Sequence, residues 1–344
     1  MLFSKLYKPN YLKTFTNLRT ITTTKCLKVE HAEIRIPVPW GHVSGQWWGS
    51  KEQRPILAVA GWKDNIGTFL PLIEEVSKHV GIVCIEVSGL GLSTPFPPGF
   101  FYNFDAALTI VHHVLDHFKW DKVSFMGHSL GSGTAFMYAA LYPELVDFIV
   151  GIDMLVPMPT SRENFCKVRR TSLDSFLAWD KAIARGERKL YTYEEAQEEV
   201  TKNTFNSIPR EFTAHLLQRE LVRSDSHPGR YYFRMDPRHN VKAVTYPPEQ
   251  ILEMAEQVRC PILNIKGTEF PFIEGETMYY KVCEILKKNN VPLQIENVQG
   301  SHHVHLTNTD DCVPIVKDFI RKYDSEERFS EIPNADVRKF YNFC

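Results

Sequence analysis

Short apolar runs alternate with amphipathic stretches in two separated parts of the chain. The apolar runs cover residues 56–62, 81–87, 122–128, 147–154, 261–267 and 292–298. Helical periodicity occupies residues near 68–80, 104–118, 131–142, 276–288 and 312–323; in the second of these, Leu108, Val111, Leu115 and Phe118 recur at intervals of three and four. Strands that are apolar throughout are typical of a parallel sheet with helices on both faces. The pattern therefore predicts an α/β fold with a mostly parallel central sheet.

The alternation is interrupted once, and the interruption predicts the domain organisation. Residues 157–257 are charged and aromatic, with helical runs and no convincing strand, so we expect a helical cap there. The core then comprises residues 30–156 and 258–324 and starts with two strands joined by a turn at Trp40-Gly41. Residues 325–344 are expected to form a peripheral tail.

The charge and composition of the chain restrict the classes of binding partner that we expect. The 344 residues carry 40 Lys and Arg against 41 Asp and Glu, which gives no basic field for nucleic acid. No apolar stretch reaches the roughly 20 residues that span a bilayer, so we expect no stable membrane insertion. The seven cysteines form no CxxC pair and no metal-ligand spacing, as in reduced intracellular proteins. We expect a small-molecule partner; the oligomeric state is not indicated.

The first 29 residues differ from the rest in charge. They contain five lysines and one arginine, several Ser and Thr, and no acidic residue before Glu30. This composition is typical of a mitochondrial transit peptide, and a solvated basic arm on a cytoplasmic protein is the alternative. We therefore predict an intracellular protein, cytoplasmic or mitochondrial.

The sequence Gly127-His128-Ser129-Leu130-Gly131 lies between a predicted strand and a predicted helix, which is the setting that a G-x-S-x-G nucleophile elbow requires. A serine in this turn adopts strained backbone geometry, and glycines two residues before and after it provide room. We predict that Ser129 is a nucleophile. The N–H group of Leu130, at the helix N-terminus, then faces a developing oxyanion.

A serine nucleophile needs a base, and the loop after the last predicted strand offers three histidines, His302, His303 and His305. A zinc site at these histidines is not expected, because no acidic or thiol ligand accompanies them in the sequence. The residues alone leave the choice among the three open.

With these motifs the chain resembles an α/β-hydrolase with a cap, and specifically the serine hydrolase-like (kraken-type) family. The resemblance covers about residues 31–323 and rests on AGWKDNIGTF, VSFMGHSLGSGTA and GSHHVHLTN. It implies that His302 is the base and that the N–H of Trp62 is the second oxyanion donor. The family usually has His-Gly-Trp where this chain has Ala60-Gly61-Trp62, so a side chain that normally orders this loop is missing.

Two loops offer the acid of the triad. Hydrolases of this fold commonly carry it after the strand that follows the cap, where Glu269 lies, with Glu274 close behind. The other placement is the end of the preceding strand, where Asp153 lies. An unpaired carboxylate would cost several kcal/mol to bury at the end of an apolar strand, so Asp153 requires a partner such as His302. The burial argument favours Asp153, with Glu269 as the alternative.

We therefore predict a serine hydrolase that cleaves carboxylic esters of small or medium apolar molecules through an acyl-enzyme. Epoxide hydrolases and haloalkane dehalogenases share the fold but use an aspartate at the elbow, which Ser129 argues against. No cofactor or metal is implied. The alternative function is a ligand-binding α/β-hydrolase-fold protein without activity.

Overall fold

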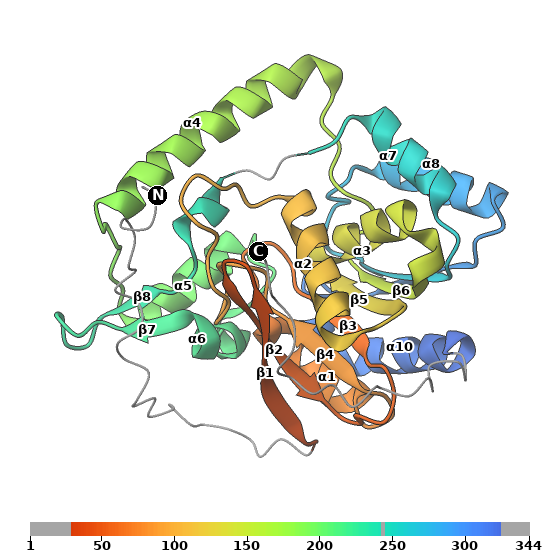
Figure 1. Cartoon of the computed structure of the whole chain (residues 1–344), viewed down its shortest axis with the longest axis horizontal. Coiled ribbons are helices and arrows are strands. Elements are labelled where there is room, and N and C mark those ends of the chain that lie inside the picture. Colours follow the sequence, from red (N-terminus) through yellow and green to blue (C-terminus); the bar gives the residue numbers. More distant parts are fainter. Residues whose placement is uncertain (1–28, 242–244, 325–344) are drawn as a thin grey trace, which may run out of the picture.

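An eight-stranded sheet forms the centre of the molecule (Figure 1). The computed structural model describes residues 29–241 and 245–324. Along the sheet the strands follow the order β1-β2-β4-β3-β5-β6-β9-β10. Their bounds are β1 His31–Val38, β2 Gly41–Trp48, β3 Ile56–Val59, β4 Ile82–Ile85, β5 Val123–His128, β6 Val146–Ile152, β9 Ile262–Gly267 and β10 Leu293–Val298.

The sheet is parallel from β4 to β10, and only the β1–β2 hairpin and its pairing with β4 are antiparallel. All side chains of β3 and β4 are buried, as expected for strands covered on both faces. The α/β class predicted from the apolar runs is confirmed, and the fold is that of the α/β-hydrolases. Since parallel strands end at the same edge, the residues after β3, β5, β6, β9 and β10 can meet in one place.

Alternate residues of each strand face opposite apolar layers. Leu57 and Val59 of β3 belong to one buried cluster, with α2 (Phe104–Phe118) and α3 (Leu130–Leu141). Ile56 and Ala58 belong to the other, which includes residues of α1 (Leu70–Val76) and α10 (Thr309–Tyr323). The helices therefore cover both faces of the sheet, and two buried clusters form the core of the hydrolase fold.

Residues 157–257 form the segment that the sequence predicts to be a cap. Its main helices are α4 (Phe165–Ala184), α5 (Tyr193–Asn203) and α6 (Ala214–Glu220). The expectation of no strand is wrong, because β7 (Leu221–Arg223) pairs with β8 (Tyr231–Phe233) in a short antiparallel hairpin. These strands have three residues each, too few to give a periodic signal, and all their side chains except that of Arg223 are half-buried.

Several contacts join the predicted cap to the core, and two of them involve buried side chains of α9 and α6. Leu306, in the short helix α9 (Val304–Thr307), is buried in the small apolar cluster of the cap. Arg219 of α6 binds Glu86, which follows β4, at 2.5 Å and Glu33 of β1 at 2.7 Å. The last helix of the segment, α7 (Pro248–Gln257), packs instead against α3 and α8 (Glu276–Lys288) of the core.

The predicted N-terminal arm, up to residue 28, and the tail 325–344 lie outside the described residues. Within the described ranges, no helix combines the length and the apolar character that crossing a membrane requires.

Candidate active site

Ser129 is the single residue between β5 and α3. Its backbone has φ 50° and ψ −116°, a conformation that costs a non-glycine residue on the order of 1–3 kcal/mol. Two hydrogen bonds hold it there: its N–H donates to the carbonyl of Ile152 and its own carbonyl accepts from the N–H of Gly133, both at 3.0 Å. The predicted elbow geometry is present, and it places the side chain at the carboxyl edge of the sheet.

The glycines of the motif are required by close backbone approach. A Cβ atom on Gly127 would overlap the carbonyl carbon of Gly131, and one on Gly131 would overlap the carbonyl oxygen of Val59. The helix α3 can therefore begin directly against the ends of β3 and β5 only because both positions lack side chains.

Asp153 and His302 are brought together at the same edge. Asp153 follows β6, is fully buried, and accepts a hydrogen bond at Oδ2 from Nδ1 of His302 at 2.6 Å. Its backbone has φ 50° and donates to the carbonyl of Ile265 at 2.7 Å, which turns the carboxylate toward the loop after β10. The buried carboxylate thus has the imidazole partner that the burial argument required.

The other two acid candidates lie elsewhere. The side chain of Glu269 is exposed, and its backbone N–H bonds the carbonyl of Gly300 at 2.9 Å. Glu274 is buried, and its Oε1 accepts from the N–H of Leu155 at 2.8 Å. Burial raises the pKa of Glu274 to about 6. Of the three carboxylates, only Asp153 bonds His302 among the described contacts.

Lys266 was not identified from the sequence. The ammonium group of this β9 residue lies 2.5 Å from Oδ1 of Asp153, and both side chains are buried, 6% and 0% exposed. The N–H of Gly267 donates to the same oxygen at 2.8 Å. A signal was present, because a lysine inside the apolar run 261–267 requires a buried acid, but its partner is 113 residues away.

The surroundings of His302 favour the neutral form of its imidazole ring. Burial lowers its pKa to about 4, and the hydrogen bond with Asp153 opposes that shift only in part. With the proton on Nδ1 donated to Asp153, Nε2 is left to accept another. The carbonyl of His302 accepts from Nε2 of His128 at 3.0 Å, so the histidine loop is bonded to the residue beside Ser129. The ring of Phe270 stacks on His302 at 4.8 Å.

The two predicted oxyanion donors flank the serine. Leu130 is the first residue of α3, so its N–H is one of those that an α-helix cannot satisfy internally. The loop carrying Trp62 passes directly over the serine, because a Cβ on Gly61 would lie 3.3 Å from Cβ of Ser129. The Trp62 ring contacts the ring of His239 edge-on at 5.2 Å.

The remaining loop histidines take part in a polar cluster behind Ser129. His303 and His128 lie beside Asp64, and one ligand atom from each of the three lies within 4.8 Å of the others. The premise that no acidic ligand accompanies the histidines is therefore wrong. Asp64 comes from the loop after β3, and the sequence gives no sign that this loop meets the one after β10.

His305 is fully buried nearby, and neither of its ring nitrogens makes a hydrogen bond among the described residues.

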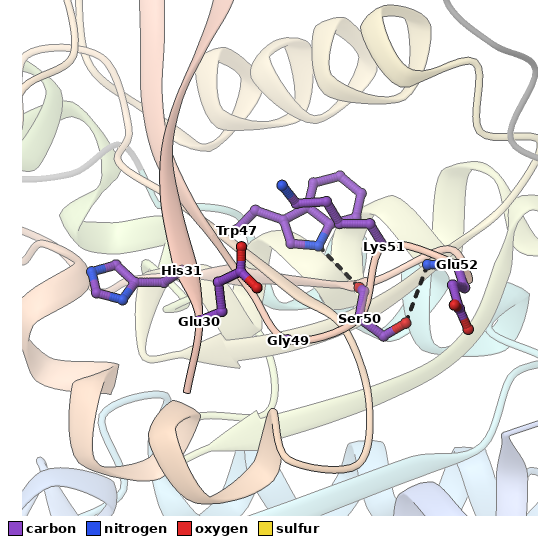
Figure 2. A pocket seen from close by; sticks show the side chains of 7 residues that line it. All are labelled: Glu30, His31, Trp47, Gly49, Ser50, Lys51 and Glu52. Atoms are coloured by element: carbon purple, nitrogen blue, oxygen red, sulfur yellow. Dashed lines mark hydrogen bonds between the residues drawn. The ribbon is translucent and has the colours of Figure 1, made fainter. Parts of the chain in front are cut away.

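A surface pocket of about 320 Å³ lies away from these residues (Figure 2). Its lining comes from Glu30, His31, Trp47 and residues 49–52. Figure 2 shows the bond from Nε1 of Trp47 to the carbonyl of Ser50, 3.1 Å long. The neighbouring Trp48 pairs with Ile82 at the start of β4, so this pocket is at the amino edge of the parallel strands, opposite Ser129. It has no part in the site.

Comparisons with known proteins identify the family of the chain. The family model described as alpha/beta hydrolase fold matches residues 54–253. Over 292 residues the chain is 31% identical to a Drosophila melanogaster protein named "Probable serine hydrolase", covering 84% of this chain and 88% of that protein. Over 331 residues it is 30% identical to a Danio rerio "Serine hydrolase-like protein", covering 95% and 99%.

Two solved structures share the fold. A hypothetical protein from Pseudomonas aeruginosa has a TM-score of 0.73 at 23% identity, covering 84% of this chain and 99% of that chain. The thioesterase domain from the curacin biosynthetic pathway has a TM-score of 0.69 at 16% identity, covering 85% and 99%. The chain belongs to the α/β-hydrolase fold family and, within it, to the serine hydrolase-like proteins.

Proposed function

We propose that the protein hydrolyses carboxylic esters of small or medium apolar molecules, with Ser129, His302 and Asp153 as its triad. The observation that carries the proposal is the buried 2.6 Å bond between Asp153 and His302, next to a serine held in elbow geometry. Such a carboxylate fixes the imidazole tautomer and stabilises the imidazolium that forms during catalysis.

The proposed steps are those of a serine hydrolase that uses these three residues. Oγ of Ser129 attacks the ester carbonyl carbon while Nε2 of His302 takes the hydroxyl proton. The N–H groups of Trp62 and Leu130 bind the oxyanion of the tetrahedral intermediate. His302 returns the proton to the leaving alcohol, which leaves an acyl group on Ser129. Water then attacks the acyl carbon, again giving a proton to His302, and the carboxylic acid and free serine are released.

The apolar surroundings support an apolar acyl or alcohol group. Phe270 stacks on His302, Trp62 follows Gly61 in the loop that approaches Ser129, and Leu130 adjoins the serine in the chain. Aromatic and aliphatic linings of this kind are typical of small-molecule sites. The name of the thioesterase domain with the same fold describes an acyl transfer to water, the same class of reaction.

Labelling with a fluorophosphonate probe tests the proposal. The wild-type protein should be labelled at Ser129, and the variant Ser129→Ala should not be labelled while retaining its circular dichroism spectrum. Esters of increasing acyl length then define the substrate range. Ala60, in place of the histidine usual in the family, is the one feature favouring a binding protein without activity, and an unlabelled wild-type protein would establish that alternative.

For the N-terminal segment we propose two alternatives, a mitochondrial transit peptide or a basic arm on a cytoplasmic protein. The support is compositional: six basic residues and no acidic residue precede Glu30.

A further inference from the structure

The polar cluster behind Ser129 contains side chains that the proposed reaction does not use. Asp64, His128 and His303 are 3%, 1% and 4% exposed. Oδ2 of Asp64 lies 3.4 Å from Nδ1 of His128 and 3.8 Å from Nε2 of His303. Their hydrogen bonds determine which of these atoms carry protons.

His128 directs a lone pair at Asp64. Its Nε2 lies 3.0 Å from the carbonyl oxygen of His302, which can only accept, so Nε2 carries the proton. In the neutral ring, Nδ1 is therefore unprotonated. This nitrogen is buried and makes no hydrogen bond within the described part of the chain, although it faces Asp64.

His303 is held in the opposite tautomer. The hydroxyl of Ser207 donates its single proton to the carbonyl of Thr204, so it accepts from Nδ1 of His303, 2.6 Å away. The proton of His303 is thus on Nδ1, and Nε2 directs a second lone pair toward Asp64.

The carboxylate is oriented as well. Its Oδ1 accepts from the N–H of Asn65 at 2.7 Å and its Oδ2 accepts from the hydroxyl of Thr68 at 2.9 Å. In residues 29–241 and 245–324, the only basic side chains within ion-pair distance of Asp64 are His128 and His303. With His128 in its neutral form, a buried carboxylate oxygen and two imidazole lone pairs face one another within 4.8 Å, and a cation bound between them balances the buried carboxylate.

We propose that Asp64, His128 and His303 bind one divalent transition-metal ion of the zinc type. One carboxylate oxygen and two imidazole nitrogens, each oriented by a further hydrogen bond, form a ligand set that zinc prefers. Bonds of about 2.0–2.1 Å place neighbouring tetrahedral ligand atoms roughly 3.3–3.5 Å apart. The separations from Asp64 are 3.4 and 3.8 Å and all three ligand atoms lie within 4.8 Å of one another, so metal binding requires the ligands to move closer together.

His305 or a water molecule could provide the fourth ligand of the ion. The ring of His305 lies 4.4 Å from that of His128, and both of its nitrogens are buried without hydrogen bonds in the described structure. The ion would join the loop after β3, the residue before Ser129 and the residue after His302. Its role is to hold these three segments together, since none of its ligands belongs to the triad.

Metal titration of the full-length protein tests this site. After dialysis against a chelator, Zn²⁺ and Co²⁺ are added separately, with binding followed by calorimetry, Co²⁺ absorption and thermal unfolding. We expect one ion per chain, a raised Tm, and visible bands of low-symmetry Co²⁺ without thiolate charge transfer. Absence of binding at micromolar metal, or thiolate bands that identify a cysteine site, would overturn the proposal.

Variants locate the ion. Asp64→Asn and His303→Gln should each weaken Zn²⁺ binding at least tenfold, and His79→Gln, which alters an exposed histidine, should not. Equal affinity in all three would overturn the proposal. If the cluster variants fail to fold, ¹⁵N spectra of the wild-type histidines decide. Chemical shifts of Nδ1 of His128 and Nε2 of His303 that change on addition of Zn²⁺ would support the site. A His128 ring that is protonated on both nitrogens, and whose shifts do not change with Zn²⁺, would exclude it.

Discussion

Asp153 and His302 are 149 residues apart in the chain and joined by a 2.6 Å hydrogen bond in the fold. The bond forms because β6 and β10 end at the same edge of the sheet, with β9 between them. The proposed acid Asp153 thus follows β6, the strand next to the one that precedes the proposed nucleophile, and the loop after β9 bears the exposed Glu269.

Replacing the acid should therefore separate the two candidates. Asp153→Asn is expected to lower kcat by roughly 10⁴, because an amide favours the wrong tautomer of His302. Glu269→Gln should change kcat less than about threefold, since an exposed loop carboxylate is solvated. Both are measured with a chromogenic ester on protein shown to be folded. The reverse order of damage would assign the triad acid to Glu269.

The buried ion pair of Lys266 with Asp153 should stabilise the fold. Removing one partner of a buried ion pair costs roughly 3–5 kcal/mol, because the other charge stays buried. Lys266→Met should lower the free energy of unfolding in urea by that amount. The double variant with Asp153→Asn should lose less than the sum of the two single losses. Additive losses would show that the ion pair contributes nothing.

The contact between cap and core should respond to pH through Glu220. This α6 residue accepts from the N–H of Gly91 at 3.1 Å, and the charges of Glu86 and Arg234 lie near it. Burial, followed by the nearby Glu86, raises the pKa of Glu220 from 4.5 to about 7. A carboxyl with a raised folded-state pKa stabilises the fold at low pH, and that contribution is lost as pH rises through about 7.

Glu220→Gln should remove this dependence. Relative to wild type, the variant should gain on the order of 2–3 kcal/mol between pH 5 and pH 8. Urea unfolding at several pH values measures the difference, with Glu249→Gln, on the first turn of α7, as a control. A difference that stays constant with pH would mean that Glu220 titrates as in the unfolded chain.

The mature N-terminus distinguishes a mitochondrial transit peptide from a basic arm. If the segment is a transit peptide, protein isolated from its native cells should begin between Leu12 and Glu30, because transit peptides are removed after import. Mass spectrometry of the intact protein gives the terminus directly. A chain that still starts at Met1 would identify the segment as a basic arm.

Sequence reasoning succeeded where a local rule determines the outcome. The elbow at Ser129 follows from a short motif between a strand and a helix, and the partner of Asp153 follows from the cost of burying charge. It failed where the decisive contact joins distant loops. The approach of Asp64 to the histidines and the pairing of Lys266 with Asp153 depend on strand order, which periodicity does not reveal.

Leu306 lies four residues after His302 and is buried in the apolar cluster of the cap. A fully buried leucine contributes about 1.5–3 kcal/mol relative to an exposed one. Separation of the predicted cap from α9 would expose Leu306 to water, so packing of this segment stabilises the loop that carries His302. A change in the apolar cluster around Leu306 should therefore alter the order of that loop as well.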